Sequence, residues 1–125
     1  MALLTASLRA QLEENGRRQH PLKGTNDEID FQPVAKLYTP LMPAVWLLTE
    51  IDPEDRDMAF GLCVLGDRQR TLDYVSLKEL EGRFGLELVK RDESFQADQP
   101  LSAYAAKAGA APSTAGSSRG SPKAR

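Results

Sequence analysis

The sequence is poor in the residues that form disulfides, bind metals or cross membranes. Its 125 residues include one cysteine and one histidine, too few for a disulfide framework or an ordinary zinc site. The longest wholly apolar run, residues 44–48, is far shorter than the roughly 20 residues of a membrane span. Charged residues follow Leu3 and Leu4 too soon to leave the apolar region of a signal peptide. We therefore expect a small cytoplasmic domain with no membrane segment.

Basic charge is also scarce in most of the chain, which holds 16 Lys and Arg against 18 Asp and Glu. Residues 107–125 contain four of the basic residues and no acid, so residues 1–106 carry a net charge of -6. This balance argues against a basic nucleic-acid-binding domain. Residues 107–125 also lack aromatic and branched aliphatic side chains, and so cannot offset the entropy of ordering. We predict a single domain over 1–106 and a disordered tail over 107–125, which is either a neutral extension or a weak basic tether to an anionic partner.

Capping signals predict three helices. The first runs from Thr5, a suitable N-cap, to Asn15, where the Asn-Gly pair is a usual stop. A capping box at residues 76–79 starts the second, which ends near Gly85, and a short helix at residues 102–106 closes the domain. The polar stretch 17–33 is predicted as a long loop. A loop of this length is either a functional flap or contains a short element.

Strand signals lie between the first and second helices. Residues 34–39, 44–51 and 58–65 are predicted strands with short connections, which favours an antiparallel meander. Residues 86–91 form a candidate fourth strand at an edge. Within 58–65 the large and the small side chains alternate, so we expect a helix to approach the small face closely. The predicted fold is α+β: a small antiparallel sheet of three to four strands, with the N-terminal and capping-box helices packed on it.

The few chemically reactive side chains are better explained as structural. Cys63 and Trp46 lie inside apolar strands, so we expect both in the core, with the thiol unreactive. His20 lies in the polar stretch and is expected to be an exposed loop residue. The chain has no Gly-x-Ser-x-Gly motif and no phosphate-binding loop. No catalytic residue, metal site or cofactor is therefore assigned.

The densest charge cluster covers residues 50–57. Its carboxylates are candidates for binding a partner, and they are Glu50, Asp52, Glu54, Asp55 and Asp57. A solvated loop and a site for a hard cation are the alternatives, because oxygen ligands suit such ions. The spacing is not that of an EF-hand. A second candidate surface is a basic patch of Arg17, Arg18, Arg68 and Arg70, should these residues converge in space.

A series of short motifs resembles a bacterial family of single-domain proteins, the domain of unknown function 2958. The motifs are VAKLYTP (34–40), WLLTE (46–50), FGL (60–62), YVSLKELE (74–81) and PLS (100–102). The resemblance covers roughly Leu3 to Ala106 and departs from the family pattern at 66–73 and 83–87. It implies that the gene belongs to plasmids or integrated mobile elements, and it brings no catalytic residues with it.

Together these observations favour a non-enzymatic protein-interaction or accessory module of a mobile genetic element. A specific version is an anti-defence protein whose carboxylates imitate nucleic-acid phosphates. One alternative is a small carboxylate- or cation-dependent enzyme, which would need a pocket uniting Glu50 with a basic residue such as Arg91. The other is a nucleic-acid accessory protein that uses the basic patch and the tail.

Overall fold

The computed structural model describes residues 3–40, 43–66, 69–83 and 89–110. This part of the chain is α+β, as the sequence predicts. The elements in chain order are α1 (Ala6–Gln19), the 3-10 helix η1 (His20–Leu22), β1 (Ala35–Thr39), β2 (Ala44–Ile51), β3 (Met58–Leu65), β4 (Gln69–Ser76), α2 (Leu77–Arg83), β5 (Lys90–Arg91) and α3 (Leu101–Ala108).

The five strands described form one antiparallel sheet in the order β4-β3-β2-β1-β5. β1 to β3 make the predicted meander, which β4 extends by one strand, and β2 and β3 have the predicted bounds. The prediction of three to four strands is wrong because residues 69–76 form β4. None of the β4 residues is fully buried, so this edge strand lacks the apolar run typical of inner strands. β5 lies at the opposite edge, within the stretch predicted as an edge strand.

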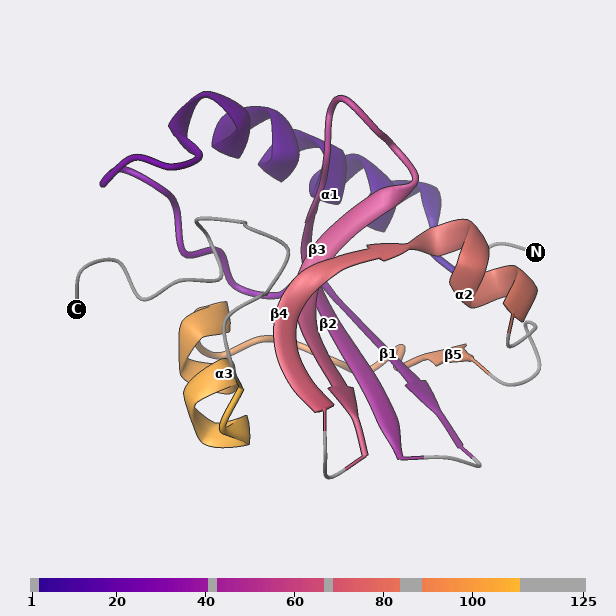
Figure 1. The fold of residues 1–125 in the computed structure, drawn as a ribbon. Coiled ribbons are helices and arrows are strands. Elements are labelled where there is room, and N and C mark those ends of the chain that lie inside the picture. The colour runs from indigo at the N-terminus through magenta and orange to yellow at the C-terminus, as the bar shows by residue number, and fades with distance from the viewer. Residues whose placement is uncertain (1–2, 41–42, 67–68, 84–88, 111–125) are drawn as a thin grey trace.

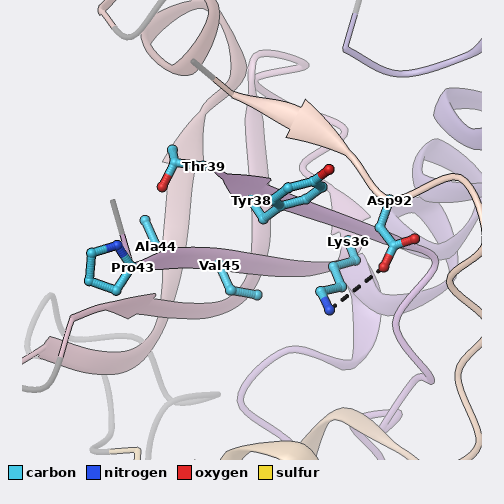
Figure 2. Close-up of a pocket in the computed structure, with 7 residues that line it drawn as sticks. All are labelled: Lys36, Tyr38, Thr39, Pro43, Ala44, Val45 and Asp92. Carbon is cyan, nitrogen blue, oxygen red and sulfur yellow. Dashed lines mark ion pairs between the residues drawn. The ribbon is translucent and has the colours of Figure 1, made fainter. Parts of the chain in front are cut away.

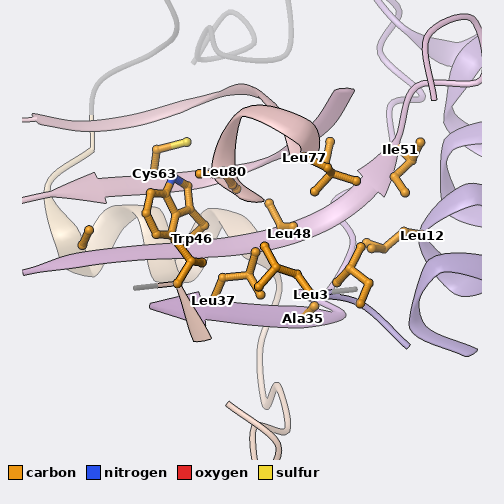
Figure 3. Packing of buried hydrophobic residues seen from close by; sticks show 14 residues of the cluster. Leu3, Leu12, Ala35, Leu37, Trp46, Leu48, Ile51, Cys63, Leu77 and Leu80 are labelled. Carbon is orange, nitrogen blue, oxygen red and sulfur yellow. The ribbon is translucent and has the colours of Figure 1, made fainter. Parts of the chain in front are cut away.

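Each face of the sheet carries its own apolar cluster. α1 and α2 lie over one face, where Leu12 and Leu77 share a cluster with Trp46 (Figures 1 and 3). α3 packs on the other face, against β3 and β4, where Leu101 shares a cluster with Phe60. Burial on both faces explains why β2 is apolar throughout most of its length.

α1 begins as predicted and ends later than predicted. The Thr5 side chain accepts a hydrogen bond from the Leu8 amide at 3.1 Å, which confirms the N-cap. The predicted stop at Asn15-Gly16 is wrong: both residues are buried within a helix that continues to Gln19. The Asn15 side chain donates to the Thr49 carbonyl of β2 at 2.9 Å. Packing against β2 therefore overrides the local stop signal.

The small face of β3 lies under helices, but the close approach of helix to sheet at Gly16 involves β2. Ala59 and Cys63 belong to the cluster covered by α1 and α2. A Cβ on Gly61 would instead lie 1.9 Å from the Leu47 carbonyl oxygen of the neighbouring strand. The helix that touches the sheet backbone does so through Gly16, against β2. Helices cover the small face of β3, but the close approach of a helix to sheet backbone that the glycines show is at Gly16, to β2, rather than the predicted approach to β3.

The two later helices start close to where the sequence places them. The Ser76 hydroxyl accepts the Glu79 amide at 3.1 Å, which confirms the capping box, and α2 begins at Leu77. Gly85, its predicted end, lies outside the described residues. α3 follows Pro100 and extends to Ala108, two residues beyond the predicted 106. Residues 111–125, most of the predicted tail, lie outside the described residues as well.

Candidate functional site

The connection between β2 and β3, residues 52–57, is the acidic loop, and its own side chains shape it. The Asp52 amide donates to the Met58 carbonyl at 2.9 Å and closes the loop. The Asp52 carboxylate accepts the Glu54 amide at 2.9 Å, and the Asp55 carboxylate accepts the Asp57 amide at 3.3 Å. These bonds fix the backbone in short turns. The loop is therefore a preformed feature of the surface.

α1 braces the acidic loop from the side. The Arg9 guanidinium donates to the Arg56 carbonyl at 3.4 Å, and Arg56 lies 3.9 Å from the Glu13 carboxylate. His20 Nε2 lies 3.4 Å from the Glu54 carboxylate. His20 is thus not an isolated loop residue, since it lies at the end of α1 and contacts the acidic loop. The fixed loop and its brace come from segments about 30 or more residues apart, which the sequence does not reveal.

Asp57, at the base of the acidic loop, accepts hydrogen bonds from the start of α2 and from the residue before it. Its carboxylate accepts the Ser76 hydroxyl and, at 2.8 Å, the Lys78 amide at the start of α2. Partial burial acts to raise the pKa of Asp57, but these hydrogen bonds and the charges of Lys78 and Arg9 hold it below its usual value. Asp57 therefore joins the acidic loop to α2.

Glu50 is not on the surface. It lies in β2 next to an irregularity in the ladder, opposite Phe60, and only 2% of it is exposed. Of the predicted acids, Glu54 and Asp55 are exposed and Asp52 is half-buried. The structure thus divides the predicted set into one buried residue, one helix cap and three residues at the surface.

The predicted loop 17–33 is largely an ordered segment. Its first residues complete α1 and η1, and residues 23–34, here named the strap, lead to β1. The buried side chain of Gln19 holds the strap: its amide group donates to the Ile29 carbonyl at 2.7 Å and accepts the Ile29 amide at 2.9 Å. The short element that the sequence leaves open is therefore η1.

A hollow of about 390 Å³ lies between the strap, the sheet and the start of α3. The strap hollow has an apolar floor and a polar rim, and its lining residues are Asn26, Glu28, Ile29, Asp30, Phe31, Thr49, Phe60, Leu72, Leu101 and Ser102. The Asp30 carboxylate accepts the hydroxyl of Ser102 and its amide, the latter at 3.2 Å. The strap is thus joined to α3.

The described basic residues of the predicted patch, Arg17, Arg18 and Arg70, do not gather at one place. Arg17 pairs with Glu14 at 2.8 Å, and Arg18 lies over the Phe31 ring, both at the end of α1. Arg70 donates to the Ala108 carbonyl at the end of α3. Figure 1 shows the end of α1 and the start of β4 on opposite sides of the molecule. Arg68 lies outside the described residues.

A second hollow of about 350 Å³ lies over β1 and β2. Figure 2 shows Lys36 and Asp92 facing each other there, with Nζ and Oδ2 3.7 Å apart, next to Tyr38. Hydrogen bonds from Ser94, with a smaller contribution from Lys36, hold the pKa of Asp92 below its usual value. This pair could not be predicted from the sequence, because its two residues lie far apart in the chain.

The thiol of Cys63 and the indole of Trp46 lie in the core, where the sequence predicts them. Burial raises the pKa of the Cys63 thiol to about 12, with a further contribution from Asp73. Trp46 and Cys63 are 2% and 4% exposed, so both core predictions are confirmed. Arg91 lines a hollow beside Thr5 and Leu8 in the described part, and Glu50 is not among the residues that line it. Within the same residues, no group of three or more His, Cys, Asp or Glu could hold a metal ion.

The fold and these surfaces define a small α+β protein with an antiparallel meander and helices on both faces. The chain belongs to the family of proteins of unknown function DUF2958, whose family model matches residues 3–115. No curated protein and no solved structure matches it significantly. No helix in the described ranges is long and apolar enough to cross a membrane.

Proposed function

We propose that this protein is a non-enzymatic interaction module of the cytoplasm, and that it binds a partner protein through the acidic loop. The observation that carries the proposal is the brace between α1 and the loop, at Arg9, Arg56 and the His20–Glu54 contact. A loop that is already fixed loses little conformational entropy on binding, so its charges contribute more fully to affinity. The contact residues are Asp52, Glu54 and Asp55.

The experiment compares two triple variants of the full chain as baits in host lysate. The first neutralises the acidic loop with Asp52→Asn, Glu54→Gln and Asp55→Asn. The second removes as many charges elsewhere, with Asp27→Asn, Glu79→Gln and Glu93→Gln. The proposal is supported if a partner is retained by the wild type and by the second variant but lost by the first. That partner should also bind the purified wild type directly, with an affinity that falls as salt rises.

The opposite pattern would refute it. If the acidic-loop variant retains every protein that the wild type retains, the acidic loop is not the contact surface. Circular dichroism and thermal unfolding of both variants check that they remain folded. Asp57 is left unchanged because its carboxylate caps α2 and its removal would perturb the fold itself.

The proposal extends to a role on a plasmid or integrated mobile element, and there to interference with host defence. Its support is the resemblance of the motifs at 34–40 and 74–81 to a family of such elements. The gene neighbourhood tests the first part: replication, conjugation or integration genes beside this one are expected. Competition between the purified protein and DNA for a defence nuclease tests the second, and an unchanged cleavage rate would contradict it.

A further inference from the structure

The strap hollow has preformed walls. Gln19 fixes the strap at Ile29 through two hydrogen bonds, and the Leu101 amide of α3 donates to the Phe31 carbonyl at 2.9 Å. The bonds between Asp30 and Ser102 close the same side. A hollow of about 390 Å³ with walls held in this way requires little rearrangement to receive a ligand.

The chemistry of the lining is divided between floor and rim. Phe60, Leu72 and Leu101 make an apolar floor, while the carboxylates of Glu28 and Asp30 lie in the strap. The charged lining residues are therefore both acidic. A carboxylate has more acceptor positions than the Asp30 bonds to Ser102 use, so further donors can bind there. A group with an apolar body and a cationic end complements this surface.

The exposed rim of the hollow indicates whether such a group belongs to a free small molecule or to a larger partner. Asn26, Asp30 and Ser102 are all exposed at the rim. Sites for free small molecules usually enclose roughly 70–90% of the ligand surface, whereas a hollow with exposed residues at its rim leaves its occupant in contact with solvent. A side chain that is carried by a larger partner needs no such enclosure, because the surrounding contacts add to its affinity.

We propose that the strap hollow binds a basic side chain of a partner protein together with an apolar side chain beside it. The guanidinium of an arginine is the best match, since its donors lie in a fixed plane and its charge complements both carboxylates. This inference rests on the proposed interaction function, but it concerns a different surface from the acidic loop.

The test is a titration of the full chain, labelled with ¹⁵N, with two blocked dipeptides. Acetyl-Leu-Arg-amide is the probe, and acetyl-Leu-citrulline-amide is its uncharged match. We expect saturable shifts of the Ile29, Phe31 and Leu72 amides with the arginine peptide, and binding about tenfold weaker with the citrulline peptide. Glu28→Gln should weaken the arginine peptide by a similar factor. Asp27→Asn, a neighbouring acid outside the lining, should change it less than about twofold.

A second variant covers the case in which Glu28→Gln alters the strap. Leu72→Trp fills the hollow and keeps both carboxylates, so it should abolish binding while leaving the fold unchanged by circular dichroism. Equal binding of the two dipeptides, or no saturable shift at these amides, would overturn the proposal. Equally strong binding of 2-phenylethylamine would assign the hollow to free amines and overturn the partner-protein occupant.

The two proposals fail separately. The dipeptides should bind the acidic-loop triple variant as they bind the wild type, since that variant leaves the hollow unchanged. If the dipeptides do not bind, but a partner that depends on the acidic loop is found, only the proposal for the hollow is rejected. Dipeptide binding without any acidic-loop-dependent partner would reject the acidic loop as the contact surface.

Discussion

The backbone of Gly16 in α1 lies directly against the backbone of Ile51 at the end of β2. A Cβ atom on Gly16 would be 1.7 Å from the Ile51 carbonyl oxygen, which is far inside van der Waals contact. The neighbouring Asn15 side chain donates to Thr49 in the same strand. Helix and strand are therefore held together at the point where the chain enters the acidic loop.

Gly16→Ala should destabilise the protein. Alanine favours a helix by about 1 kcal/mol over glycine, but here the added methyl meets backbone that cannot rotate away. We expect the free energy of unfolding to fall by about 1–3 kcal/mol, the usual cost of overpacking. Urea unfolding measures it. Gly82→Ala in α2 is the control, because no described atom beyond its chain neighbours and the backbone of its own helix lies within 4 Å of its Cβ position, and there we expect a gain of about 0.5–1 kcal/mol. A gain at both positions would contradict the close approach.

The end of α1 shows one limit of reading a sequence. Asn-Gly is a sound helix stop by local propensity, and the N-cap at Thr5 follows the same rules correctly. The helix nevertheless continues to Gln19, because Asn15 and Gly16 are buried against β2. Contacts between segments about 35 residues apart are not visible in a local pattern. The site depends on this extension, since Gln19 and His20 both lie beyond the predicted stop.

Gln19→Leu should release the strap. The substitution keeps the volume roughly constant and removes both partners of the Ile29 backbone groups. A buried polar group left without its partner costs about 1–3 kcal/mol. We expect faster hydrogen exchange at the Ile29 amide and a lower unfolding free energy. Gln11→Leu, on the exposed side of the same helix, removes a hydrogen bond to Asn15 instead and should leave the Ile29 amide as protected as in the wild type. Unchanged exchange in the Gln19 variant would show that the strap is held by other contacts.

Asp57→Asn should lower stability at neutral pH and reduce its acid dependence. The folded pKa of Asp57 lies below the ordinary value, so its carboxylate stabilises the fold above about pH 4 and loses this effect as pH falls through the folded pKa. At pH 7 we expect a loss of about 0.5–2 kcal/mol, as for other helix caps. The difference from wild type should shrink below pH 4. Asp55→Asn, at the exposed tip, serves as the control, and a constant difference at all pH values would contradict the assignment.

The strands and the charged residues show how much of the fold and of the candidate site can be predicted from the sequence. β2 and β3 are predicted to the residue because long apolar runs end at Pro43, Asp52 and Gly66. β4 is missed because its half-buried residues mix charged and apolar side chains, and β5 exists only through its pairing with β1. The density of charge along the sequence predicts the acidic loop, but not what each of its residues does. Only the fold shows that Glu50 is buried and that Asp57 caps a helix.

Cys63 should remain unmodified in the native protein. It lies in β3 opposite Trp46 in the ladder (Figure 3), and burial raises its pKa from 9.0 to about 12. At pH 8 the reactive thiolate is therefore far rarer than for an ordinary thiol. We expect labelling by a thiol-specific reagent only through unfolding, with a rate that rises with urea. Leu65→Cys in a Cys63→Ala background places a thiol at the more exposed end of the same strand and should react rapidly. If Cys63 in the native protein reacted as fast as this control, the thiol would be accessible and the case for a purely structural cysteine would fail.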